Sequence, residues 1–91
     1  MLDDYLNSPQ PQKSMECKTD NKWHKFELVG NKIVVGELSI KLDILESKDD
    51  VYLAEYFFDK NIIVDFRKKS ITIKNPKYPD VGLKFECIDY N

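Results

Sequence analysis

The most constraining feature of this chain is a stretch near its middle in which apolar and polar residues alternate strictly. The order is Glu37, Leu38, Ser39, Ile40, Lys41, Leu42, Asp43, Ile44. Successive side chains of a β-strand point to opposite faces of a sheet, so this pattern predicts a strand that is buried on one face and solvated on the other.

Two β-hairpins are expected on either side of this strand. Residues 23–35 predict the first, because Gly30 and Asn31 form a turn pair that tolerates positive φ between two apolar runs. Residues 62–74 predict the second, with a basic connection between its strands. Residues 75–80 contain two prolines and predict a loop, after which alternation over residues 83–90 predicts a last strand.

The segment between the hairpins predicts a helix. The polar residues from 46 to 50 offer an N-terminal cap, and Leu53, Tyr56 and Phe57 recur at helical spacing. A short helix over about 49–60 is therefore expected. A strand is the competing interpretation, since the same segment is rich in valine and aromatic residues.

These elements predict an α+β fold. About six short strands in two hairpins form a mostly antiparallel sheet packed with one central helix, and a small open barrel with the helix at one end is the alternative arrangement. The length of 91 residues leaves room for one core, so residues 23–91 are expected to form a single domain. Residues 1–22 are expected to form a proline- and glutamine-containing arm, either loosely ordered or docked through Leu2, Tyr5 and Leu6.

The two cysteines, Cys17 and Cys87, lie near opposite ends of the chain. In an oxidising compartment one bridge would restrain the unfolded state by about 4–5 kcal/mol. Two free thiols are the favoured interpretation, because Cys87 lies in an alternating pattern typical of core packing. No apolar run approaches the ~18 residues needed to cross a bilayer, and the acidic N-terminus does not resemble a secretory signal, so a cytoplasmic location is expected.

No motif for catalysis or for a cofactor is evident. His24 is the only histidine, so a Cys–His dyad or a zinc site would have to use it together with Cys17 or Cys87. The three glycines are scattered and do not form a phosphate-binding loop. We therefore expect no catalytic residues, no metal and no cofactor, and a protein that is not an enzyme.

One stretch is similar to a known family. Residues 52–73 resemble the closing segment of retropepsin-like aspartic proteases, in which a hydrophobic turn leads to an Ile/Val-Asp-Phe strand and a basic hairpin. The resemblance covers about a quarter of the chain and implies a related strand arrangement. It does not imply protease activity, because the family's Asp-Thr/Ser-Gly triplet is absent and Asp43, the nearest counterpart, has no glycine after it.

The leading hypothesis is a small acidic protein that acts by covering a partner protein, as an immunity protein, an antitoxin or a phage-type inhibitor does. The net charge is −2, and carboxylates with interleaved tyrosines complement a basic cleft such as that of a toxin or nuclease. The expected partner-binding residues are Glu46, Asp49, Asp50, Tyr52, Glu55, Tyr56 and Asp59.

Two other classes of function stay open. A regulatory module that binds nucleic acid would use a basic set of residues with one aromatic neighbour, although the net acidic charge argues against this class. A structural or assembly subunit would self-associate through the arm and an exposed sheet edge. The basic set is Arg67, Lys68, Lys69, Lys74, Lys77 and Tyr78.

Overall fold

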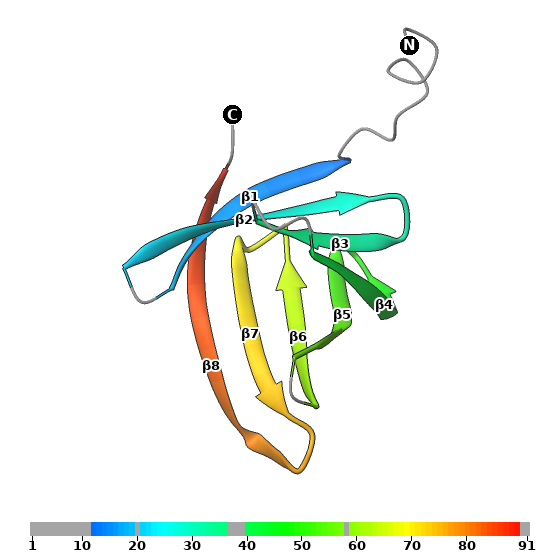
Figure 1. The fold of residues 1–91 in the computed structure, drawn as a ribbon, viewed down its shortest axis with the longest axis vertical. Helices are drawn as coiled ribbons and strands as arrows, with labels where there is room; N and C mark the ends of the chain where they lie inside the picture. Colours follow the sequence, from blue (N-terminus) through cyan, green and yellow to red (C-terminus); the bar gives the residue numbers. More distant parts are fainter. Residues whose placement is uncertain (1–11, 20, 37–39, 58, 90–91) are drawn as a thin grey trace, which may run out of the picture.

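The chain folds into a closed antiparallel barrel of eight strands in which each strand pairs with its neighbours in sequence and β1 pairs with β8 (Figure 1). The computed structural model describes residues 12–19, 21–36, 40–57 and 59–89. The strands are β1 (Lys13–Thr19), β2 (Lys22–Val29), β3 (Lys32–Val35), β4 (Ile40–Lys48), β5 (Val51–Tyr56), β6 (Lys60–Asp65), β7 (Ser70–Asn75) and β8 (Tyr78–Asp89).

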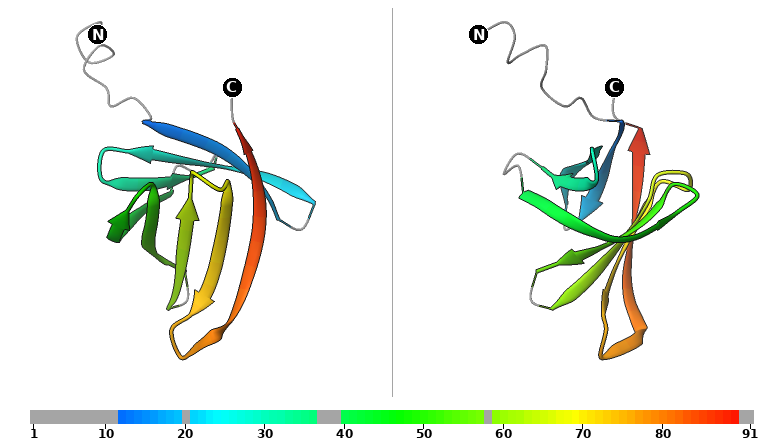
Figure 2. Two further views of the ribbon diagram at one scale, coloured as in Figure 1. Left: turned by 180° about the vertical axis from the view of Figure 1, so that it is seen from behind. Right: turned by 90° about the vertical axis from the view of Figure 1, so that its right-hand side faces the viewer.

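The barrel consists of two curved layers that share β4. Residues 40–43 of this strand pair with β3, whereas residues from Ile44 onward pair with β5. The register shifts between Ile44 and Glu46, which leaves Leu45 as the extra residue of a β-bulge, and a bulge bends its strand. Strands β1–β3 consequently run across the upper end of the layer formed by β5–β8 (Figure 2).

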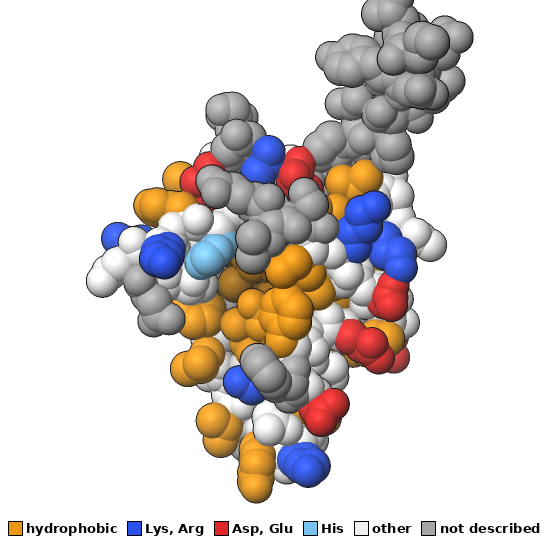
Figure 3. All heavy atoms as spheres, in the orientation of Figure 1, with side chains coloured by type: hydrophobic (Ala, Val, Ile, Leu, Met, Phe, Trp, Pro, Cys, Tyr) orange, Lys and Arg blue, Asp and Glu red, His pale blue; other side chains and the backbone are white. Residues whose placement is uncertain are grey.

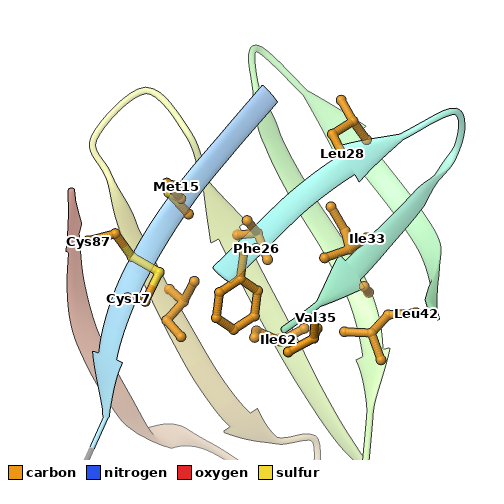
Figure 4. Close-up of a cluster of buried hydrophobic side chains, with 12 residues drawn as sticks. Met15, Cys17, Phe26, Leu28, Ile33, Val35, Leu42, Ile62 and Cys87 are labelled. Atoms are coloured by element: carbon orange, nitrogen blue, oxygen red, sulfur yellow. A yellow bond between two sulfur atoms is a disulfide. The ribbon is translucent and has the colours of Figure 1, made fainter. Parts of the chain in front are cut away.

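Alternate side chains from both layers fill the interior (Figure 4). Barrels of eight strands have an interior just wide enough for side chains to pack. Ile33, Ile62 and Val64 are fully buried, and Phe26 fills the centre of the view in Figure 4. The buried apolar residues are Met15, Cys17, Phe26, Leu28, Ile33, Val35, Leu42, Ala54, Ile62, Val64, Ile71 and Cys87.

The barrel closes along a seam between the first and last strands. Among the described residues, three pairs join β1 to β8, namely Met15 with Asp89, Glu16 with Ile88, and Cys17 with Cys87. These two cysteines form a disulfide. The expectation of two free thiols is therefore wrong: the strand pattern at Cys87 correctly indicated an inward side chain, but that side chain faces its partner across the seam. Disulfides persist mainly in oxidising compartments, and the cytoplasmic location stays a prediction.

The expected helix over 49–60 is absent, and the competing strand interpretation is confirmed. Asp49 and Asp50 both have positive φ, 51° and 69°, which is the backbone of a two-residue type I′ hairpin turn and not of a helix cap. The following strand β5 alternates, with Ala54 buried inside and Glu55 exposed outside. Pairing with β4 on one side and β6 on the other stabilises the strand, although the spacing of its apolar residues also fits a helix.

The α+β fold class is accordingly wrong, because the chain is all-β where it is described. Both expected hairpins are present: β2 and β3 are joined at Gly30 and Asn31, and β6 and β7 are joined across residues 66–69. Residues 13–19, expected in the arm, form β1 of the barrel, whereas residues 1–11, including Leu2, Tyr5 and Leu6, lie outside the described residues. The described ranges contain no helix that is long and apolar enough to span a membrane.

The seam generates a first prediction. The disulfide closes a loop with a sequence separation of 70 residues, so reducing it should lower the free energy of unfolding by about 4 kcal/mol through the added freedom of the unfolded chain. Guanidinium unfolding of the wild-type protein with and without dithiothreitol measures this change. The double variant Cys17→Ala/Cys87→Ala is the control and should not respond to the reductant. A wild-type change below about 1 kcal/mol would contradict the seam's stabilising role.

Candidate partner-binding surface

The structure does not bring the seven residues expected at an acidic partner-binding surface together. Asp49 and Asp50 lie in the β4–β5 turn, and Asp50 forms an ion pair with Lys13 at 3.2 Å. Asp59 lies in the β5–β6 turn, at the opposite end of β5. The cluster expected on one helix face is thereby spread over two ends of the barrel.

The four remaining residues of that set divide between two faces. Glu46 and Glu55 are exposed on the outside of the barrel. Tyr52 and Tyr56 are half-buried and pack against the core, where Tyr52 meets the Phe66 ring edge-on with centroids 5.8 Å apart. The tyrosines therefore do not offer contact area beside the carboxylates, and the acidic surface stays a prediction.

The basic set is divided in the same way. Arg67, Lys68 and Lys69 form most of the β6–β7 turn, which is held by the Asp65 carboxylate accepting the amides of Arg67 and Lys68 at 3.0 and 2.9 Å. Lys69 pairs with Asp89 at 2.9 Å. Lys74, Lys77 and Tyr78 lie at the other end of β7, around the β7–β8 turn. The structure therefore splits these residues into two groups separated by the length of a strand.

The residues considered for catalysis are also accounted for. Cys17 lies directly opposite His24 in the β1–β2 ladder, but its sulfur is bonded to Cys87. Asp43, the counterpart of a protease aspartate, is exposed on β4 and forms an ion pair with Lys32. Among the described residues, no group of three or more side chains could hold a metal ion.

A different surface stands out on β8. A row of paired residues crosses the inner face of the sheet from Ala54 through Ile62 and Ile73 to Leu83. Ala54 and Ile62 are fully buried, Ile73 is half-buried, and Leu83 is 63% exposed. Burial falls along this row because the β1–β3 layer covers only the upper part of β8 (Figure 1).

The exposed apolar surface continues toward the β7–β8 turn. Val81 is 68% exposed and lies two residues before Leu83, where the register between β7 and β8 shifts. Figure 3 shows hydrophobic side chains gathered in the middle of this view and again at the lower tip of the molecule, where the β7–β8 hairpin extends (Figures 1 and 3). Residues 81–85 of β8, which lie beyond the residues that pair with β1, are called the β8 overhang below.

The overhang also presents an open strand edge. The Cys87 amide donates to the Lys69 carbonyl at 2.8 Å, which places the backbone groups of Cys87 on the β7 side. Backbone groups of successive strand residues point to opposite edges, so Gly82 and Lys84 direct their amides and carbonyls away from β7. Among the described strands, β1 is the neighbour on that side and pairs only with residues 87–89. The edge at Gly82 and Lys84 is therefore open.

Local sequence explains why the hairpin can extend this far. Asn75 accepts the Lys77 amide through its side-chain oxygen at 2.9 Å, which makes a compact turn around Pro76. Gly82 adds no side chain to the outer face, where a Cβ would lie 3.3 Å from Lys74 Cγ. The expectation of a loop over 75–80 missed this extension, although the alternation of Val81, Leu83 and Phe85 is a signal that could have found it.

Comparisons with known proteins do not add a family to this description. No protein-family model matches the chain, and no curated protein or solved structure gives a significant match.

The fall in burial along the inner row generates a second prediction. Ile62→Ala should lower the free energy of unfolding by about 2–5 kcal/mol because it empties a packed interior position. Leu83→Ala should lower it by less than about 1 kcal/mol, because most of that side chain already contacts water. Chemical unfolding of the two variants measures both values. Equal costs would show that β8 is covered along its whole length.

Proposed function

We propose that this protein is a non-catalytic protein-binding module that pairs the β8 overhang with an extended segment of a partner protein. One observation carries the proposal: on the same stretch of β8, unpaired backbone groups at Gly82 and Lys84 lie beside exposed apolar side chains at Val81 and Leu83. Strand addition uses both features, since main-chain hydrogen bonds give affinity and alternate side chains give specificity.

The physical chemistry of the overhang favours a strand over other occupants. Exposed edge strands are templates for pairing with another chain, and proteins usually protect them with short length, prolines or charges. Lys84 supplies one such charge, but it lies on the outer face and leaves the inner apolar face unguarded. A partner segment with apolar residues at alternate positions would extend the sheet and cover Val81 and Leu83 together.

This proposal keeps the masking mode of action expected from the sequence and changes the surface that performs it. A partner that contributes a strand is covered over the length of that strand, and this masking requires no catalytic step. The expectation of a basic toxin or nuclease as partner depended on an acidic cluster, whose members lie at two ends of the barrel. The partner proposed here instead contributes an extended segment with apolar residues at alternate positions.

The proposal predicts a specific response to proline. Selection of a displayed library of linear peptides against the full protein should enrich sequences with apolar residues at alternate positions. Lys84→Pro should weaken their binding by about 10-fold or more, because proline has no amide to donate to the incoming strand. The ladder to β7 does not use that amide, so thermal unfolding of the variant should stay close to that of the wild type.

Lys84→Ala is the matched control, because it removes the same charge and keeps the amide. Its peptide affinity should match that of the wild type. Equal losses in the alanine and proline variants would assign the effect to charge and contradict strand addition, as would a selection that enriches no alternating sequence. A dimer in solution that Lys84→Pro converts to a monomer would also contradict the proposal, by making a second copy of the chain the occupant.

A further inference from the structure

A depression of about 830 Å³ opens at the end of the barrel where β3 stops. Its apolar lining comes from both layers: Val35 and Ile40 from one, and Tyr56 and Phe57 from the other. The Tyr56 and Phe57 rings lie 4.8 Å apart at their centroids. Trp23 borders the depression from the outer face of β2, where Lys18 Nζ lies 6.0 Å from its ring centroid. Figure 3 shows this gathering of hydrophobic side chains with the chain's one histidine, in pale blue, beside it.

The course of the strands explains why the barrel is open here. Gly36 has a φ of +62° and donates its amide to the Lys25 carbonyl at 2.6 Å, which ends β3 partway along β2. Residues 40–43 of β4 pair with β3 and the strand reaches β5 only from Ile44 onward. The two layers therefore diverge toward this end, and inner apolar side chains of both layers line the depression.

The inner face of β2 becomes polar as it reaches the depression. Leu28 and Phe26 are buried, His24 is half-buried and Lys22 is exposed, in the order in which they approach the opening. Alternation places all four on the same face of the strand. Lys22 forms no ion pair with the described residues, and it lines the depression on the same face of β2 as His24, two residues away.

The other charged residues of the lining belong to the outer face. Lys25 and Glu27 alternate with the inner residues of β2 and pair with each other at 3.6 Å. Glu16 lies on β1 next to the buried Met15 and Cys17, and so also points outward. The inner rim itself therefore carries hydrogen-bond donors and one positive charge above an aromatic wall.

We propose that this depression binds a planar aromatic carboxylate. The ring system lies against Tyr56, Phe57 and Ile40, and the carboxylate accepts hydrogen bonds from Lys22 and His24. This site shares no residue with the β8 overhang, so it is independent of the proposed function.

Tyr56 suits the aromatic wall of such a site. Burial raises the pKa of the Tyr56 phenol above its ordinary value of 10.0, because desolvation disfavours the phenolate. The side chain therefore stays neutral near pH 7 and does not repel an anion. Its ring packs on Phe57, which fixes the orientation of both faces.

Titration of the labelled full protein followed by amide NMR tests the proposal, with 1-naphthaleneacetate as the probe. The amide signals of His24, Tyr56 and Phe57, whose residues line the depression, should shift with saturation. Two comparison ligands separate the contribution of the carboxylate charge from that of the aromatic ring. The neutral 1-naphthaleneacetamide lacks the charge and decanoate lacks the ring, and each should bind at least about 5-fold more weakly.

Variants identify the residues. Lys22→Gln should weaken the binding of 1-naphthaleneacetate at least about 5-fold and leave the binding of 1-naphthaleneacetamide unchanged. Phe57→Leu should weaken the binding of both ligands. Lys41→Gln, at an exposed position on the outer face of β4, is the control and should bind as the wild type does. Absence of saturable shifts, equal affinity for carboxylate and amide, or an unchanged Lys22→Gln variant would overturn the proposal. Shifts confined to β7 and β8 would overturn its location.

Discussion

The disulfide between Cys17 and Cys87 is the interaction on which the rest of this structure depends. A chain of eight strands has to join its first strand to its last to form a barrel, and three pairs among the described residues do so here. Closing this seam brings together residues from opposite ends of the sequence at a cost in chain entropy. The covalent bond removes most of that cost from folding, because the two strands are already linked in the unfolded chain.

The position of the seam also decides which surfaces the protein presents. Because β1 meets the long strand β8 only near its C-terminal end, no described strand pairs with the lower part of β8 on that side, and Leu83 there is exposed. At the other corner, the bulge at Leu45 bends β4 from one layer to the other, and the layers separate around Tyr56 and Phe57. Both proposed sites are thus consequences of where the two layers stop covering each other. Neither proposed site requires a catalytic group.

Local signals in the sequence were sufficient for part of this fold and insufficient for the rest. The hairpin at Gly30 and Asn31 could be predicted, because turn residues and alternation are both short-range properties. The helix over 49–60 could not be excluded locally, since Leu53, Tyr56 and Phe57 happen to match helical spacing, and pairing with β4 and β6 decided the outcome. The exposure of Val81 and Leu83 was beyond prediction for the same reason: a covered and an uncovered strand have the same alternation, and the difference lies in where β1 ends.

The central claim is that β8 is closed by β1 at residues 87–89 and open at residues 81–85. Amide hydrogen exchange measured residue by residue along β8 tests it most directly. We expect the amides of Leu83 and Phe85 to be protected by β7 and those of Gly82 and Lys84 to exchange rapidly. Near the disulfide, where β1 also pairs with β8, protection should become continuous. Uniform protection of Gly82 and Lys84 in the isolated protein would contradict it, because a further strand would then have to occupy the edge.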